Sequence, residues 1–145
     1  MATSGYSGTP LVTKLGIKAG HRVLLDSAPE GFETVSLVGL PDGVVVHHRA
    51  GRSAYDVVVA FRRDARTFVR QLARDTTRIT TDGRLWVAWP KRASGVATDL
   101  SDVVVRTEGL ATGVVDVKVC AIDETWSGLC FVRRVSDRPR HRGVE

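Results

Sequence analysis

The chain has 145 residues, of which 43% are hydrophobic, and this composition allows one domain that builds its core without metals or disulfide bonds. No apolar run approaches the roughly 18 residues of a membrane span, and the amino terminus lacks the basic and apolar segments of a secretory signal. We therefore expect a cytoplasmic protein without a membrane partner. Cys120 and Cys130 are too few for a disulfide scaffold or a four-cysteine zinc site, so reduced thiols are expected; whether the two lie close enough to pair stays open.

The excess positive charge lies mainly at the carboxyl end. The formal net charge is +5, and from Arg133 to Glu145 five arginines stand against two acidic residues, so this stretch contributes +3. A short arginine-rich terminus interrupted by proline and glycine is typical of a solvated tail. We predict one domain over residues 1–135 and a basic, flexible tail over residues 136–145. No aromatic residue is interleaved with these arginines to stack on bases, which argues against nucleic acid as the partner.

Helix and strand signals alternate along the first half of the chain. Thr9 and Pro10 are typical of a helix start, and Gly16 suits the left-handed stop of a helix over residues 11–15. Residues 55–61 are mainly apolar and β-branched, as in a strand that is buried on both faces. The other elements expected here are a strand over residues 21–26, a turn over residues 27–32 that leads into a helical stretch ending at residues 41–43, and a strand over residues 44–48.

The second half continues this alternation. Residues 64–74 predict an amphipathic helix, because Phe68, Val69 and Leu72 are apolar among charged neighbours. The remaining expected elements are a turn at residues 82–83, a strand over residues 84–89, a helix over residues 103–110, a strand over residues 114–122, a turn over residues 123–128 and a last strand over residues 129–135.

This order of elements predicts the α/β fold class, with a three-layer, Rossmann-like, mostly parallel sheet and a carboxyl-terminal hairpin that adds one antiparallel strand. Helices on both faces leave a parallel sheet without a solvated side. The side chains expected to be almost wholly buried in this sheet are Val57, Val58, Val59, Leu85, Val87, Val117 and Val119.

Two segments make the scaffold similar to an abridged class I methyltransferase, whose sheet also ends with an antiparallel strand inserted by a hairpin. Residues 83–90 (GRLWVAWP) resemble the late strand of that fold, and residues 55–59 (YDVVV) resemble the strand before it. In methyltransferases a glycine-rich turn after the first strand lets the backbone approach the cofactor. Here that turn reads DSAPEG over residues 26–31, with one glycine and with Pro29, which has no amide donor. We therefore expect no binding of S-adenosylmethionine.

A second resemblance covers nearly the whole chain. Its segments are GYSGTPL at residues 5–11, APEGF at 28–32, WVAWPK at 86–91, SGV at 94–96, TDL at 98–100 and VKVCAIDETWSG at 117–128. They resemble a family of small, mainly actinobacterial proteins, domain of unknown function family 3052. The resemblance implies a cytoplasmic bacterial protein and assigns no activity, substrate or catalytic residue. Cys130 stands where relatives are expected to have a basic residue, so neither cysteine receives a role.

Ligands of open parallel sheets bind beyond the carboxyl ends of the strands, and this rule selects the loops of a candidate crevice. Its residues are Pro29, Glu30, Gly31 and Phe32 after the first strand, Arg62 and Arg63 after the third, Trp89, Lys91, Arg92, Ser94 and Gly95 after the fourth, and Asp123, Glu124 and Trp126 after the fifth. Together they predict a crevice of mixed charge with aromatic walls.

A small anionic ligand is one partner that these loops suit. Lys91 and Arg92 beside Ser94 and Gly95 have the charges and backbone amides that hold a phosphate or carboxylate. The alternative is that these charges are solvated and merely end a strand.

For the acidic and aromatic candidates, a purely structural role is the alternative to a functional one. Glu30 with Asp123 or Glu124 would form an acid–base pair if the carboxylates lie close together, and otherwise they are helix-start and turn residues. Trp89 and Trp126 either line a pocket for a planar ligand or belong to the core.

No catalytic residue, metal site or cofactor is assigned from the sequence. His47 and His48 are adjacent on a strand and so point to opposite faces, with no third ligand nearby. No nucleophile elbow, phosphate-binding lysine loop or cysteine–histidine pair is present. Three functions stay open: a non-catalytic binding or regulatory module, a small methyltransferase-like enzyme, and an interaction protein whose basic tail engages an acidic protein or RNA.

Overall fold

The computed structural model describes residues 9–134, so the tail predicted over residues 136–145 lies outside the described residues. The helices and strands, in chain order, are α1 (Leu11–Leu15), β1 (Arg22–Asp26), β2 (Val45–His47), β3 (Tyr55–Phe61), α2 (Ala65–Thr77), β4 (Ile79–Pro90), α3 (Asp102–Ala111), β5 (Val114–Ala121) and β6 (Trp126–Arg133), with a π-helical turn η1 (Phe32–Ser36) and a 3-10 turn η2 (Arg92–Ser94).

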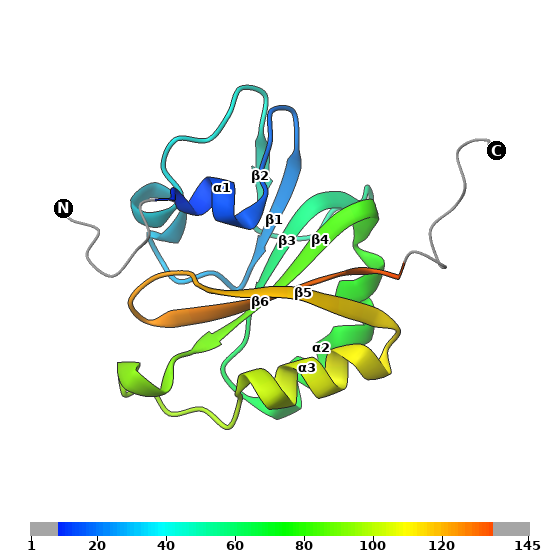
Figure 1. The fold of residues 1–145 in the computed structure, drawn as a ribbon. Coiled ribbons are helices and arrows are strands. Elements are labelled where there is room, and N and C mark those ends of the chain that lie inside the picture. Colours follow the sequence, from blue (N-terminus) through cyan, green and yellow to red (C-terminus); the bar gives the residue numbers. More distant parts are fainter. Residues whose placement is uncertain (1–8, 135–145) are drawn as a thin grey trace.

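The strands form one sheet in the order β2-β1-β3-β4-β6-β5 (Figure 1). The four strands from β2 to β4 pair in parallel. Strand β6 is antiparallel to both β4 and β5, so β5 runs in the same direction as β4. The predicted α/β class, with a Rossmann-like, mostly parallel sheet and an antiparallel carboxyl-terminal hairpin strand, is confirmed.

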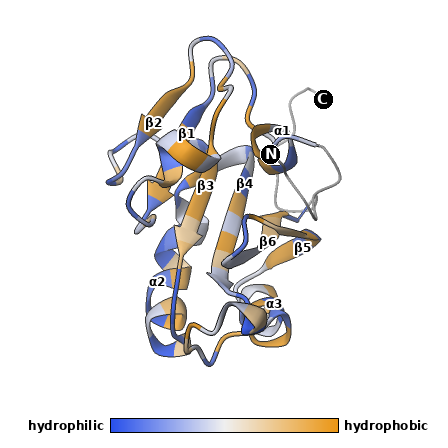
Figure 2. Cartoon of the chain, turned by 90° about the vertical axis from the view of Figure 1, so that its left-hand side faces the viewer, coloured by the Kyte–Doolittle hydropathy of each residue, from blue (hydrophilic) through white to orange (hydrophobic). Residues whose placement is uncertain are grey.

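Each face of the sheet carries its own hydrophobic core. Val57 and Val59 of β3 pack on the side of α1, whereas Val58 faces α2 and α3, as expected from the two-residue period of a strand. Figure 1 shows α2 and α3 together on one side and α1 on the other. In Figure 2, β3 is largely hydrophobic, while hydrophobic and hydrophilic residues alternate around α2. The Trp86 indole donates a hydrogen bond of 3.0 Å to the Leu15 carbonyl and so joins α1 to β4.

Local signals explain where the helices begin and end. Helix α1 ends at Gly16, whose φ of 83° is the left-handed conformation that glycine adopts most easily. Asp64 caps α2 by accepting from the Thr67 amide at 2.8 Å. Ser101 caps α3 by accepting from the Val104 amide at 3.3 Å. The predicted helices over residues 11–15, 64–74 and 103–110 are therefore present, with shifts of a few residues at their ends.

Two local predictions are wrong. The helical stretch expected between residues 32 and 41 is a single π-helical turn, and the chain then passes through Gly39 in the left-handed conformation, with Val35 and Val38 exposed instead of packed. The turn expected at Asp82 and Gly83 lies inside β4 as an irregularity. There β4 advances five residues, from Ile79 to Arg84, while β3 advances two.

The predicted burial of the sheet is confirmed at its centre and wrong at one edge. Val57, Val58, Val59, Leu85 and Val87 are fully buried. Val117 and Val119 are 51% and 49% exposed. They lie on β5, which pairs with β6 alone at the edge of the sheet and has a register shift between residues 116 and 118, so α3 covers only part of this strand. Among residues 9–134, no helix is long and apolar enough to cross a membrane.

The contact between α3 and β6 requires a residue without a side chain. A Cβ atom on Gly109 would collide with the fully buried ring of Phe131. We expect Gly109→Ala to lower the free energy of unfolding by about 2 kcal/mol, because overpacking outweighs the gain of about 1 kcal/mol in helix propensity. Urea denaturation measures the change. Thr107→Ala, on an exposed position of the same helix, is the control and should not destabilise the protein.

Candidate functional site

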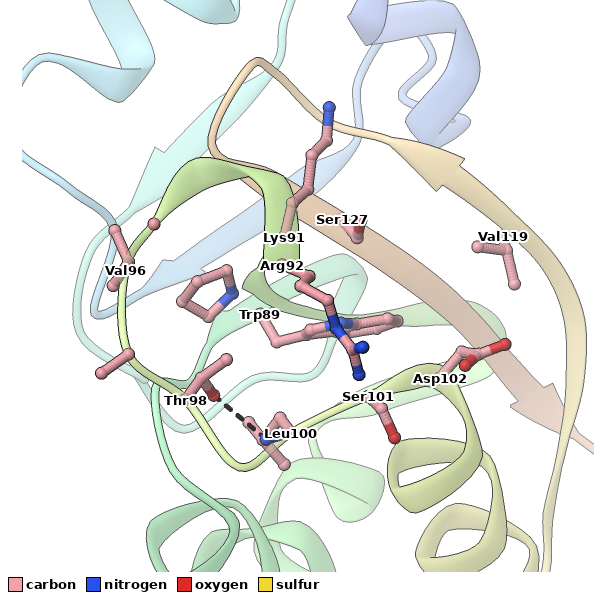
Figure 3. A pocket seen from close by; sticks show the side chains of 13 residues that line it. Trp89, Lys91, Arg92, Val96, Thr98, Leu100, Ser101, Asp102, Val119 and Ser127 are labelled. Carbon is pink, nitrogen blue, oxygen red and sulfur yellow. Dashed lines mark hydrogen bonds between the residues drawn. The ribbon is translucent and has the colours of Figure 1, made fainter.

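A pocket of about 520 Å³ opens beyond the carboxyl end of β4 (Figure 3). We call it the Arg92 pocket. Its walls come from the connection between β4 and α3, from the first residues of α3 and from the β5–β6 hairpin. The lining residues are Trp89, Pro90, Lys91, Arg92, Gly95, Val96, Ala97, Thr98, Leu100, Ser101, Asp102, Val119 and Ser127. Of the residues selected from the sequence, Trp89, Lys91, Arg92 and Gly95 line this pocket together.

The loop after β4 is held by hydrogen bonds within itself. The amides of Ser94 and Gly95 donate to the carbonyls of Lys91 and Arg92 at 3.1 and 3.3 Å. The Ser94 hydroxyl donates to the Lys91 carbonyl at 2.6 Å and accepts from the Val96 amide at 3.2 Å. These groups, which the sequence analysis considered for an anion, therefore shape the loop and are not free to hold a ligand.

The opposite wall of the Arg92 pocket is tied to the segment between β3 and α2. The Thr98 hydroxyl donates to the Arg63 carbonyl at 2.6 Å and accepts from the Leu100 amide at 3.1 Å. The Asp99 carboxylate accepts from the Ala65 amide at 2.7 Å. Because both walls are fastened by such bonds, the pocket is formed before any ligand arrives.

The positive charge inside this pocket comes from Arg92. Figure 3 shows the Arg92 side chain reaching into the pocket and the Lys91 amine pointing away from it. Among residues 9–134, no carboxylate lies within ion-pair distance of Arg92, whereas Asp102 is 3.7 Å from Arg106 of the same helix. Trp89 is buried in the core and forms an apolar wall. The first amides of α3 have no partner within the helix, and they add a partial positive charge at the same place.

Arg62 does not line the Arg92 pocket but forms a buried ion-pair cluster at the end of β3. Its Nη2 atom donates to Asp26 at 2.9 Å and to Asp75 at 2.8 Å. Arg78 lies 3.7 Å from Asp26 and 3.8 Å from Asp75. Burial raises the pKa of Asp75, and the nearby Arg62 opposes that shift. Burial by itself would lower the pKa of Arg62, but the attraction of Asp75 and Asp26 outweighs it and raises that pKa.

The sequence analysis did not identify Asp75 as the partner of Arg62. One signal for it exists: Asp75 follows Phe68 and Leu72 at the spacing of one helix face, so a carboxylate is placed on the buried side of α2. Asp26 ends β1, and only the parallel pairing of β1 with β3 brings it to Arg62.

The aromatic residues selected from the other loops belong to the core. Phe32 packs edge-to-face on Phe61 at 4.9 Å between ring centroids, and Trp126 packs on the same ring at 5.0 Å. The Arg63 guanidinium lies 5.4 Å from the Trp126 ring centroid. These side chains therefore stabilise the sheet and do not form the walls of the Arg92 pocket.

The acidic candidates lie in turns outside the Arg92 pocket. The Asp123 carboxylate accepts from the amides of Thr125 and Trp126, both at 2.8 Å, and so caps the β5–β6 turn. Glu30 and Glu124 are exposed. The candidates that do not line the Arg92 pocket are Pro29, Glu30, Gly31, Phe32, Arg62, Arg63, Ser94, Asp123, Glu124 and Trp126.

His47 and His48 have hydrogen-bond partners, and Cys120 and Cys130 do not pair with each other. His47 bonds to the Tyr55 hydroxyl at 2.7 Å and His48 to Glu33 at 2.7 Å. Within residues 9–134, no group of three or more potential metal ligands is present. Both cysteines are free thiols, and in the β5–β6 register Cys130 lies opposite Lys118, not opposite Cys120. Burial raises the pKa of Cys130 to about 12, so this thiol is not a thiolate nucleophile at neutral pH.

Comparisons with solved structures show the methyltransferase fold. A TehB-like SAM-dependent methyltransferase from Corynebacterium glutamicum has a TM-score of 0.58 at 10% identity, over 86% of this chain and 85% of that one. The CcbJ methyltransferase of Streptomyces caelestis has a TM-score of 0.56 at 12% identity, over 86% and 87%. An O-methyltransferase family 2 protein from Planctomyces limnophilus, in complex with apigenin, has a TM-score of 0.59 at 12% identity, over 80% of this chain but only 50% of that one. This chain therefore spans about half of the Planctomyces protein.

No protein-family profile and no curated protein sequence matches the chain. The structural likeness, at such low identity, establishes the scaffold alone.

The Arg62 cluster predicts a pH-dependent stability change when the arginine is removed. We expect Arg62→Leu to lower the free energy of unfolding by about 3 kcal/mol at pH 7, because the buried Asp75 carboxylate loses its partner at 2.8 Å and retains the more distant Arg78, at 3.8 Å. The folded-state pKa of Asp75, already raised by burial, then rises further above its unfolded value. The folded state binds the proton more tightly, so the variant regains stability as the pH falls through that raised pKa. Urea titrations from pH 8 to pH 5 measure this.

Arg66→Leu, on an exposed position of α2, is the matched control and should show neither effect. Adding Asp75→Asn to Arg62→Leu should abolish the recovery at low pH. A recovery that persists in the double variant would assign the titration to another group.

Proposed function

We propose that this protein is a cytoplasmic binding or regulatory module that takes a small anionic molecule in the Arg92 pocket and catalyses no reaction there. The observation that carries this proposal is an arginine that has no carboxylate partner among residues 9–134 and reaches into a partly apolar pocket. A guanidinium holds a carboxylate or phosphate by two charge-assisted hydrogen bonds. Among residues 9–134, the hydroxyl groups that line this pocket have no hydrogen bond to a histidine or carboxylate that would activate them as nucleophiles.

The shape and lining of the pocket point to a ligand with an apolar body. Its volume of about 520 Å³ is within the range of small-molecule sites. Trp89, Leu100 and Val119 line the pocket with apolar surface, and Arg92 provides the charge. An organic acid that packs its body on the indole and directs its carboxylate to Arg92 matches both features.

The ligand class predicts a dependence on charge and on one arginine. Benzoate should bind saturably and shift the amide resonances of residues 91–102 in two-dimensional NMR spectra, while benzamide, its uncharged counterpart, should bind at least about tenfold more weakly. Arg92→Ala should weaken benzoate binding at least about tenfold, because a charge-assisted pair contributes roughly 1.5–3 kcal/mol.

Lys18→Ala is the control, because it removes the same charge from an exposed residue that does not line the pocket. Its benzoate affinity should change less than about twofold. An equal loss of benzoate affinity in the two variants would show that binding depends only on the net charge of the protein. It would overturn the assignment of the site to Arg92.

A methyltransferase is the second candidate, because solved methyltransferases share the scaffold. The region that would receive S-adenosylmethionine does not fit it. In place of a flexible glycine turn, the chain after β1 has Ser27 in a left-handed conformation, with φ of 61°, and Pro29 without an amide donor. The Asp26 carboxylate at the end of β1 is already engaged by Arg62, at 2.9 Å. The described segment between β1 and β2 contains a π-helical turn and no α-helix whose amino terminus would point at a ligand.

We therefore expect no binding of S-adenosylmethionine at physiological concentrations. Isothermal titration calorimetry with S-adenosylmethionine and S-adenosylhomocysteine should show no saturable heat, while benzoate in the same preparation provides the positive control. A micromolar dissociation constant, or a cocrystal with the cofactor over residues 28–31, would move the protein into the enzyme class.

We propose that the chain belongs to the actinobacterial domain of unknown function family 3052, because segments such as residues 117–128 resemble it. A protein partner for the basic carboxyl-terminal residues is an alternative role, which rests on the charge of that stretch in the sequence.

A further inference from the structure

A second crevice, of about 290 Å³, lies at the ends of β1 and β2 and shares no lining residue with the Arg92 pocket. We call it the arginine crevice. It opens where β1, β2 and β3 end, against one face of α2. Its lining residues are Asp26, Ser27, His48, Arg49, Ala50, Arg62, Thr67, Gln71, Arg74 and Arg78.

The lining of the arginine crevice is strongly basic. Four arginines stand against one carboxylate, so its formal charge is +3 if His48 is neutral. Arg62 and Arg78 are compensated by Asp26 and by the buried Asp75. Within residues 9–134, neither Arg49 nor Arg74 has a carboxylate at ion-pair distance. Two exposed guanidinium groups, one after β2 and one on α2, therefore remain for an external anion.

The Arg62 guanidinium, which lines the floor of the arginine crevice, is held in place by three hydrogen bonds. Its Nη1 atom donates to the Phe61 carbonyl at 3.1 Å, and its Nη2 atom is held by two carboxylates. Its buried Nε atom has no hydrogen-bond partner. A buried N–H without a partner costs free energy, and such groups in native structures are often explained by a ligand, ion or water.

Two further features are typical of a ligand site. The crevice lies at the position where the sheet order reverses, because the chain leaves β1 for β2 on one side and then crosses to β3 on the other. Ser27 at its rim has φ of 61°, which is uncommon for a residue other than glycine and is typical of functional sites.

We propose that the arginine crevice binds the phosphate group of a small molecule, with Arg49 and Arg74 contacting the anion and the ion-paired Arg62 and Arg78 forming the floor beneath them. A phosphate dianion matches this crevice better than the organic acid proposed for the Arg92 pocket. The lining offers several guanidinium groups and the polar side chains of Ser27, Thr67 and Gln71, but Ala50 is its sole apolar residue.

The test uses inorganic phosphate and pyrophosphate with the full-length protein, at constant ionic strength set by chloride. Two-dimensional NMR should show saturable shifts of amides in residues 26–27, 48–50 and 67–78. The double variant Arg49→Gln/Arg74→Gln should weaken phosphate binding at least about tenfold, because charge-assisted contacts to the anion are lost. The matched control Arg66→Gln/Arg70→Gln removes two exposed α2 arginines outside the crevice and should change the affinity less than about twofold.

The outcomes distinguish phosphate binding in the arginine crevice from binding in the Arg92 pocket. They also distinguish it from non-specific attraction to a positively charged protein. Arg92→Ala should leave phosphate binding in the arginine crevice unchanged, so a failure at one site does not decide the other. Stronger binding of pyrophosphate than of phosphate would point to a diphosphate ligand, and equal binding to a phosphomonoester. Equal weakening by the two double variants, or shifts that do not saturate, would overturn the proposal. Thermal melting of each variant confirms that the comparison is made between folded proteins.

Discussion

The buried guanidinium of Arg62 connects the three elements around which the rest of the fold is arranged. It stands after β3 and bonds to Asp26 at the end of β1 and to Asp75 within α2. Desolvating such a cluster costs several kcal/mol per ion, and the cost is offset because two carboxylates and a backbone carbonyl surround the charge. The segment between β3 and α2, fixed in this way, then fastens the wall of the Arg92 pocket through Thr98 and Asp99. One ion-pair cluster thus influences both proposed sites.

The same cluster is one reason why we expect no S-adenosylmethionine binding on this methyltransferase-like scaffold. In open parallel sheets the space between the strands at which the order reverses normally receives the ligand. Here Asp26 and Arg62, paired at 2.9 Å, line a basic crevice at that place. The crossover from β1 to β2 has only a π-helical turn, so no helix amino terminus is available there either. The two sites proposed for anions lie where arginines have no carboxylate partner among residues 9–134, in the loop after β4 and beside α2.

The sequence predicted those parts of the fold that local signals determine. The pattern of residues 55–61 predicted a buried strand, and these residues form β3. Gly16 was predicted to end a helix, and it ends α1. The prediction failed where the outcome depended on distant elements. Val117 and Val119 look like core residues, but they lie on an edge strand that α3 covers only in part. At the site, the loop after β4 was found because one loop supplies Trp89, Lys91, Arg92 and Gly95 together. The roles of Asp26 and Asp75 were not found, because their contact with Arg62 exists only after β1, β3 and α2 have packed.

The positions of the arginines without a carboxylate partner among residues 9–134 favour our proposal of small anionic ligands over nucleic acid. Much of the net charge lies in the carboxyl-terminal stretch, yet Arg49, Arg74 and Arg92 belong to the folded part and have no carboxylate partner within it. A nucleic-acid surface needs cations in a continuous row that follows the phosphate backbone, together with aromatic side chains on which bases stack. These three arginines are instead divided between two concave sites without a common residue, and the aromatic residues Phe32 and Trp126 are buried. Charges confined to separate pockets concentrate small anions and discriminate against a polymer that cannot enter either one.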